Sequence, residues 1–249
     1  MSESVFSLAN GYMGVRGYFE EGYSGDTLKG SYFNGIYERR VLKGQSYKGI
    51  TDTTEFMVNA ADWLWLRIEA EGEELDLARS DIRSFQRILY LRNGVLSRSF
   101  LWVTKTGKKI EVELERFLSM EKTETGAQRV RVRALDQEVT VTIKAGIDFS
   151  NPQESMGENL WKCSEQVSGD GMVGILGTTV STGQKVYAAA CFDGNYDGLE
   201  CQEPEEKRVF VKLRFSLKEG ERKGFTRIAK NLTGKHLGTE DGLEKRRFE

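Results

Sequence analysis

Residues 3–22 concentrate the residue types that could do chemistry. Gly11, Gly14 and Gly17 recur at every third position among large apolar and aromatic side chains, and Arg16 lies between the last two. Glycine-rich backbone and a guanidinium together could bind an anionic group such as a phosphate. The residues favour the structural alternative, a strand and turn in a core whose glycines serve bulges or tight bends. The spacing also differs from the G-x-G-x-x-G of a dinucleotide site, and no strand precedes it.

Trp63 and Trp65 form a second candidate site. Both lie on one face of a period-2 segment at residues 63–70, and the opposite face is aliphatic. Flat aromatic rings suit the apolar faces of pyranose rings, so the pair could stack on a sugar. Large aromatic side chains also fill cores and domain interfaces, and this alternative stays open.

The sequence gives little support for disulfide or metal chemistry. Cys163, Cys191 and Cys201 are odd in number, and no two stand at C-x-x-C spacing, so neither a disulfide framework nor a zinc site is predicted. His236 is the only histidine, and it has neither a second imidazole for a metal site nor an obvious nucleophile to activate. We therefore expect no metal site, reduced thiols and a surface histidine.

The composition is typical of a soluble globular protein. The 249 residues carry a net charge of −2 at pH 7, with 39% hydrophobic and 30% charged residues, so bulk attraction to nucleic acid is not expected. No apolar run approaches the roughly 20 residues of a membrane helix, and the N-terminus lacks the pattern of a secretory signal. We expect a cytoplasmic protein that binds neither nucleic acid nor a membrane.

The elements that must position these residues are predicted to be strands, because nearly every periodic segment has period 2. The clearest segments are at residues 95–103, 110–114, 130–134, 139–143, 172–180, 186–192 and 209–217, of which the first two form a hairpin. The block 31–37 is expected to be a short strand, and 148–159 and 193–207 are expected to be polar connections. The predicted fold class is therefore all-β, a large antiparallel β-sandwich.

One predicted strand has a row of carboxylates on a single face. Glu111, Glu113 and Glu115 alternate with apolar residues, so this face is expected to be solvated, with a basic partner surface as the alternative. Alternate residues along a strand hold their oxygens too far apart to share a small cation.

Helical signals appear only near the end of the chain. Thr239 could cap a helix with acidic residues in its first turn and basic residues in its last, which is the charge order that a helix dipole prefers. A helix of about ten residues is marginal on its own in water, so it is typical of the start of a longer element. We predict a β-sandwich domain at residues 1–230 and the start of a helical linker at 231–249.

Five blocks in the first half of the chain carry a family resemblance. They are ESVFSLANGYMGVRGYFEEG (3–22), SYFNGIY (31–37), EFMVNAADWLWL (55–66), LYLRNGVLSR (89–98) and RFLSM (116–120). In this order they resemble the N-terminal domain of glycoside hydrolase family 65, which includes maltose, trehalose and kojibiose phosphorylases and their hydrolase relatives. Two departures concern specificity: the family tends to have Pro where 59–62 has Ala, and its members usually have a further stretch before the first block.

The resemblance implies an architecture and an activity. Family members have a β-sandwich N-terminal domain, called a super-sandwich, then a helical linker and an (α/α)₆ barrel that carries the general acid and the phosphate-binding residues. An intact member would phosphorolyse or hydrolyse an α-glucoside disaccharide without a metal or an organic cofactor. The sequence ends where the linker would begin, so the resemblance transfers no catalytic, cofactor-binding or metal-binding residue.

The adjacent carboxylates Glu20 and Glu21 do not supply the missing chemistry. Cleavage of a glycosidic bond needs carboxyl groups placed across that bond, one of them protonated. Adjacent residues in an extended segment point to opposite faces, so this pair is not expected to flank one bond. We expect solvation in a loop or a salt bridge to Arg16.

The leading hypothesis is a non-catalytic N-terminal domain of a family 65 phosphorylase or hydrolase, whose partner is the barrel of the parent chain. In this hypothesis Asn10, Gly14, Arg16 and Gly17 line the surface that meets the barrel. The alternative is a free-standing carbohydrate-binding module that uses the two tryptophans described above. A third hypothesis, a scaffold or oligomerisation domain such as a homodimer, overlaps the first.

Overall fold

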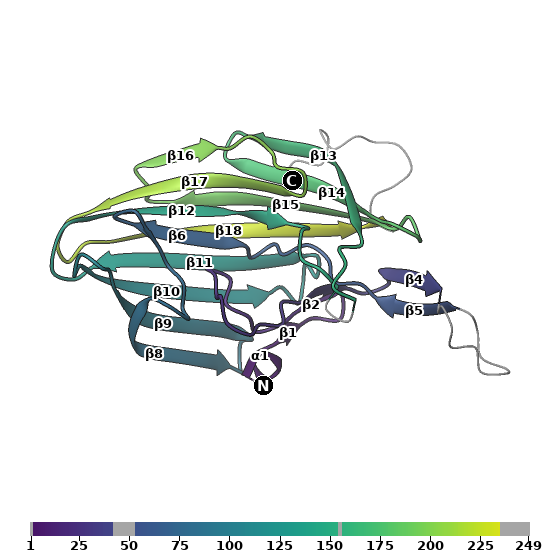
Figure 1. Ribbon diagram of the computed structural model, residues 1–249, viewed down its shortest axis with the longest axis horizontal. Helices are drawn as coiled ribbons and strands as arrows, with labels where there is room; N and C mark the ends of the chain where they lie inside the picture. Colours follow the sequence, from purple (N-terminus) through teal and green to yellow (C-terminus); the bar gives the residue numbers. More distant parts are fainter. Residues whose placement is uncertain (1, 42–52, 154–155, 235–249) are drawn as a thin grey trace.

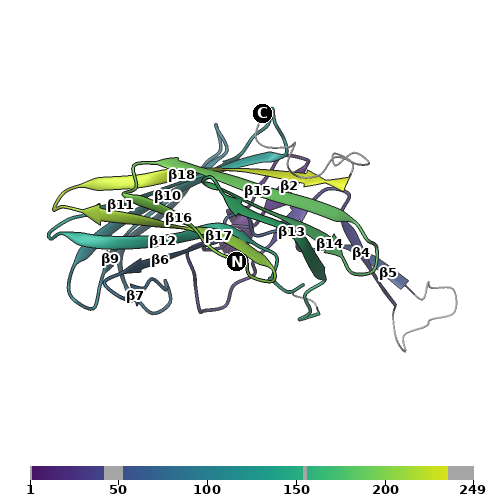
Figure 2. The ribbon, with the colours of Figure 1, turned by 90° about the horizontal axis from the view of Figure 1, so that it is seen from above.

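The computed structural model describes residues 2–41, 53–153 and 156–234. These residues form two large antiparallel sheets and two smaller ones, and the large sheets face each other as a sandwich (Figure 1). Figure 2 shows the two large sheets as separate layers when the molecule is seen from above. The predicted all-β sandwich is confirmed.

The larger sheet has eight strands. In spatial order they are β13 (Trp161–Gly169), β14 (Met172–Thr179), β15 (Lys185–Gly194), β18 (Arg222–Thr233), β11 (Thr125–Ala134), β10 (Lys109–Leu118), β9 (Val95–Val103) and β8 (Asp81–Tyr90). The last strand in the sequence, β18, therefore lies in the middle of the sheet between β15 and β11.

The second large sheet has five strands, and short elements lie beside the sandwich. Its order is β16 (Gly198–Cys201), β17 (Arg208–Leu217), β12 (Val139–Asp148), β6 (Leu66–Ala70) and β7 (Glu73–Glu74). The short elements are α1 (Ser2–Val5), the sheet of β1 (Leu8–Ala9), β2 (Met13–Val15) and β3 (Ser31–Phe33), and the pair β4 (Tyr37–Val41) and β5 (Thr53–Met57). Within the described residues, no helix is long and apolar enough to span a membrane.

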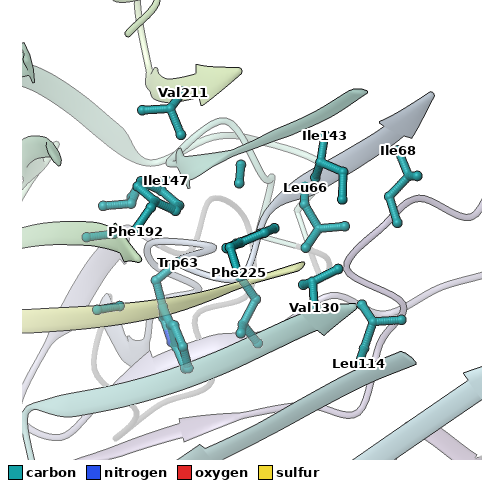
Figure 3. Close-up of a cluster of buried hydrophobic side chains, with 14 of the residues drawn as sticks. Trp63, Leu66, Ile68, Leu114, Val130, Ile143, Ile147, Phe192, Val211 and Phe225 are labelled. Atoms are coloured by element: carbon teal, nitrogen blue, oxygen red, sulfur yellow. The ribbon is translucent and has the colours of Figure 1, made fainter. Parts of the chain in front are cut away.

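Period-2 alternation explains how both sheets bury one face. In β9 and β10 every second side chain is buried, as expected for antiparallel strands with one face on a core. Figure 3 shows side chains from both sheets meeting in this core, including Ile143 of β12 and Phe225 of β18. Each large apolar side chain buried in this way contributes roughly 1.5–3 kcal/mol to folding.

The structure confirms the predicted hairpin and adds strands that the sequence analysis missed. Strands β9 and β10 pair in register, and the chain turns between them at Gly107, whose φ is 85°. The missed strands include β8, β13 and β18. The first two are edge strands with register shifts, and nearly all their side chains are exposed or half-buried, so their alternation is weak.

Strand β18 was missed for a different reason. It is buried on its inner face, but the inward positions include Arg227 and Asn231, which interrupt the apolar alternation. The strand continues to Thr233, past the predicted domain boundary at residue 230. The predicted C-terminal helix and His236 lie outside the described residues.

Two segments differ from the expected layout. The predicted strand at 31–37 is broken, because β3 ends at Phe33, the chain turns at Gly35 with a φ of 84°, and β4 begins at Tyr37. The predicted connection at 193–207 includes β16, which pairs with β17.

The carboxylate row of β10 faces outward as predicted. The basic side chains that form ion pairs with it belong to β11 and β18 of the same chain.

Candidate functional site

The opening segment is fastened to the eight-stranded sheet by Asn10. Its side-chain amide donates to the carbonyl oxygens of Ser119 at 2.6 Å and Thr123 at 2.8 Å, just beyond the end of β10. Its side-chain oxygen accepts hydrogen bonds from the backbone amides of Tyr12 and Met13. All four polar contacts lie within the domain, so Asn10 closes the turn and anchors it.

Arg16 is also bonded within the domain. Its Nε donates to the carbonyl oxygen of Leu28 at 2.9 Å, and its Nη2 donates to the Ser4 hydroxyl at 3.0 Å. The expected salt bridge to Glu20 or Glu21 is wrong, because those carboxylates bind other arginines. Arg16 remains half-buried.

Gly17 lies where the backbone approaches its neighbours closely. A Cβ at this position would lie 2.6 Å from Arg87 Nη2 and 2.7 Å from Phe6 Cβ, so only glycine fits without movement. Gly14, in β2, would place a Cβ at ordinary contact distance from Ala9. Close packing thus requires glycine at position 17, and the interface role of Asn10, Gly14, Arg16 and Gly17 stays a prediction.

The two adjacent carboxylates converge on one guanidinium. Glu20 and Glu21 are 2% and 0% exposed, and the Arg98 Nη2 of β9 donates to Glu20 Oε2 at 3.0 Å and to Glu21 Oε2. The expectation that they point to opposite faces of a solvated loop is therefore wrong. The segment that carries them is folded against the inner face of the sheet, where Arg98 can reach both.

The cluster extends across four strands of the sheet. Arg116 of β10 binds Glu20 Oε2 at 3.3 Å and donates to the carbonyl oxygen of Arg16 at 2.8 Å. Gln128 of β11 donates to Glu20 Oε1 at 3.1 Å and accepts a hydrogen bond from Arg227 of β18 at 2.7 Å. All these side chains are buried, so the opening segment is joined to β9, β10, β11 and β18 by a continuous polar network.

Arg227 connects this network to the tryptophan segment. Its guanidinium donates to the carbonyl oxygens of Trp63 at 2.6 Å and Gly146 at 2.8 Å, and to those of Leu64 and Trp65 at 3.3 and 3.2 Å. A buried cation is costly unless its donors are used. Here they bind three carbonyls of residues 63–65, directly before β6, and one carbonyl of β12.

The pKa values of the two carboxylates move in opposite directions. Burial opposes ionisation of Glu20, but the charges of Arg98 and Arg116 outweigh it and hold the pKa of Glu20 well below its usual range. Burial raises the pKa of Glu21 to about 7, and the negative charge of Glu20 adds to this effect against the opposing charge of Arg98. The Glu21 Oε1 atom is buried and has no hydrogen-bond partner among the described residues, which also disfavours the charged form.

This arrangement cannot act as an acid and base pair on a sugar. Both carboxylates are closed off from solvent, and their oxygens are directed at protein side chains rather than at a space that could hold a glycosidic bond. Within residues 2–41, 53–153 and 156–234, no three His, Cys, Asp or Glu side chains are grouped as a metal site. The cluster is a buried polar network that holds the opening segment on the sheet.

The structure does not present the two tryptophans to solvent. Trp63 and Trp65 are 1% and 4% exposed, Trp65 packs edge-on against Phe210 at 5.5 Å between ring centroids, and the Arg208 guanidinium lies 4.6 Å above its ring. Trp63 fits against Gly126, where a Cβ would lie 2.5 Å from the indole. Stacking on a sugar needs an exposed ring face, which neither ring presents in this structure, and the stacking role stays a prediction.

The sequence analysis missed the arginines and the glutamine of the cluster, although a signal was present. Arg98, Arg116 and Arg227 each occupy an inward position of their strand, in phase with buried apolar neighbours such as Leu96, Leu114 and Phe225. A charged residue in the apolar phase of a strand indicates a buried polar partner.

The chain is similar to known proteins over nearly its whole length. Residues 1–247 match the family model of the glycosyl hydrolase family 65, N-terminal domain. The chain is 29% identical over 230 residues to the alpha,alpha-trehalose phosphorylase of Thermoanaerobacter brockii, covering 85% of this chain and 30% of that protein. It is 33% identical over 163 residues to the maltose phosphorylase of Bacillus subtilis (strain 168), covering 64% of this chain and 21% of that protein.

A solved structure supports the same relationship. A putative kojibiose phosphorylase from the human microbiome superposes with a TM-score of 0.88 and 30% sequence identity, covering 96% of this chain and 31% of that one. The chain therefore spans less than a third of the length of these relatives.

Proposed function

Because this chain belongs to the glycosyl hydrolase family 65 N-terminal domain family, we propose that it is the non-catalytic β-sandwich domain of a phosphorylase or hydrolase acting on α-glucosides. The observation that carries this proposal is the match over residues 1–247, in a chain that spans less than a third of its relatives. The relatives contain other domains, and we propose that the catalytic groups lie in one of them, an (α/α)₆ barrel.

The buried carboxylates support a non-catalytic role. Glycosidases need two carboxyl groups about 5–10 Å apart with the substrate between them. Glu20 and Glu21 instead share Arg98, and Glu20 is further held by Arg116 and Gln128. In the proposed function they fix the opening segment on the sheet, and the domain supports the rest of the enzyme. The free cysteines support a cytoplasmic location as part of the same proposal.

The test is an assay of the purified 249-residue chain. It is incubated with maltose, trehalose or kojibiose, with and without inorganic phosphate, and glucose and glucose 1-phosphate are measured. We expect no turnover, and calorimetric titration with the same sugars should give no binding heat. Turnover that is lost in Glu20→Gln would overturn the proposal, and so would saturable sugar binding that is lost in Trp65→Ala.

A further inference from the structure

The eight-stranded sheet has an outer face, directed away from the five-stranded sheet, and an apolar row crosses it. Cross-strand neighbours join Phe117 of β10 to Ala127 of β11, Ala127 to Ile228 of β18, Ile228 to Cys191 of β15 and Cys191 to Met172 of β14. Phe117 and Ile228 are each 43% exposed, and the other three are half-buried. We call these five residues the outer row.

Further apolar side chains extend the outer row at both ends. Tyr90, at the end of β8, is 48% exposed and lines a shallow depression of about 420 Å³ together with Phe117 and Ala127. On the β14 and β15 side, Leu176 and Tyr187 pack on the same outer face but are buried, and the half-buried Leu232 lies against them. The exposed apolar surface is therefore centred on Tyr90, Phe117 and Ile228.

The other half of the same face shows how a solvated sheet surface is built. There Glu113 lies 3.3 Å from Arg131 and 3.1 Å from Arg222, and Glu111 lies 3.5 Å from Arg222. Side chains in this half are charged and paired across strands, as is usual for a sheet face in water. The contrast within one face indicates that the apolar half is a contact surface, because contiguous exposed apolar patches rimmed by charge mark interaction sites.

The course of the chain bears on which part of a full-length family member could cover this surface. Strand β18 carries Arg222 at its start in the charged half, then Ile228 in the outer row, and it ends at Thr233 beyond Leu232. Since the matched family is an N-terminal domain, the remainder of a full-length member follows from this end of β18. The end of β18 itself lies beside the apolar half and away from the charged half.

We propose that the outer row is the docking surface for the domain that follows in the full-length protein. The inference rests on the proposed function and deepens it, since it names the surface through which this domain supports its neighbour. The outer row lies on the sheet face opposite the cluster of Glu20 and Arg98. The proposal therefore places the contact on a different surface from the interface predicted at Asn10, Gly14, Arg16 and Gly17.

Cys191 provides a built-in probe of this surface. It is half-buried within the outer row, whereas Cys163 and Cys201 pack against the main core and serve as internal controls. Alkylation by iodoacetamide under native conditions, read by mass spectrometry, is compared between the 249-residue chain and the full-length protein. We expect alkylation of Cys191 to be about tenfold slower or more in the full-length protein, as for a docked state that is about 90% populated, with the two control thiols unchanged.

Equal reactivity of Cys191 in both proteins would overturn the proposal while leaving the proposed function intact. Protection already present in the 249-residue chain that grows with its concentration would also overturn it, because the occupant would then be a second copy. A pair of variants on one strand and one face sharpens the result. In the full-length protein, Ile228→Thr should restore Cys191 reactivity and Arg222→Thr should not, and equal behaviour of the two variants would contradict the assignment.

Discussion

Strand β10 carries charged residues on both faces, and the two faces use them differently. On the outer face, Glu113 and Arg131 pair at 3.3 Å while both remain partly exposed. On the inner face, Arg116 of the same β10 pairs with Glu20 at 3.3 Å, and both are buried. The comparison teaches that the environment of a pair decides its importance, because exposed pairs are screened by water and salt whereas a buried charge cannot lose its partner without a large cost.

The largest effect is expected for Arg98→Met in the 249-residue chain. The substitution leaves Glu20 and Glu21 buried beside each other without the guanidinium that they share, which should lower the free energy of unfolding by about 3–5 kcal/mol. For a domain of this size, that corresponds to a melting temperature roughly 6–20 °C lower. Thermal denaturation followed by circular dichroism measures it.

The matched control is Arg131→Met, which removes an arginine from the outer face of β11 in the same sheet. It should change the free energy of unfolding by less than about 1 kcal/mol, and the change should shrink further in about 1 M salt. Equal costs for the two variants would break the distinction between the faces.

A second effect concerns pH and Glu21. The pKa of Glu21 is raised to about 7 in the folded state, so between about pH 4.5 and 7 the folded chain holds a proton that the unfolded chain has released. The stabilisation of the folded state by Glu21 is therefore fully present below pH 4.5 and is lost as the pH rises to 7. The pKa of Glu20 is lowered, so the stabilisation by Glu20 is present above pH 4.5 and is lost as the pH falls.

Glu21→Gln should remove the loss of folding stability that Glu21 causes between pH 4.5 and 7. The free energy of unfolding of this variant, relative to the unmodified chain, should rise by up to about 3 kcal/mol from pH 5 to pH 8. Urea denaturation across this range measures the difference, with Glu113→Gln as the control on the outer face. Parallel pH profiles for Glu21→Gln and the unmodified chain would show that Glu21 ionises normally despite its burial.

A smaller effect should come from the contact between the opening segment and the sheet. Gly17→Ala forces a methyl group against Arg87, Phe6 and the backbone of Glu3, and overpacking of this kind costs about 1–3 kcal/mol. Gly14→Ala is the control, because its methyl group would meet only ordinary contacts. If urea denaturation gives the same midpoint for both variants, the close packing described for Gly17 is not needed for stability.

The sequence predicted the fold well where alternation was strong and poorly where polar residues interrupted it. The β9 and β10 hairpin is evident from period-2 spacing and its turn, because both signals are local. Strand β18 is central to the sheet, yet Arg227 and Asn231 stand at its inward positions and hide the pattern. Local periodicity cannot show that such side chains are satisfied by partners elsewhere in the chain.

The candidate site was harder to predict because its partners are distant in sequence. Glu20 meets Arg98, Arg116 and Gln128, which come from three strands whose register is fixed only by the folded sheet. The family resemblance was correct because it rests on ordered blocks rather than on contacts. The predicted salt bridge between Arg16 and Glu20 or Glu21 is wrong, because residues close in sequence need not be in contact in the folded chain.

The central claim is that the buried carboxylates hold this domain together and take no part in cleaving a sugar. Under the proposed function, its most direct test is Glu20→Gln in a full-length family 65 enzyme that contains this domain, with kcat for α-glucoside cleavage measured well below the melting temperature and the melting temperature measured on the same sample. We expect a lower melting temperature and a kcat within about twofold of the unmodified enzyme. An unchanged melting temperature with a kcat about 10²–10⁴ times lower, the range typical of a lost general acid or base, would contradict the account.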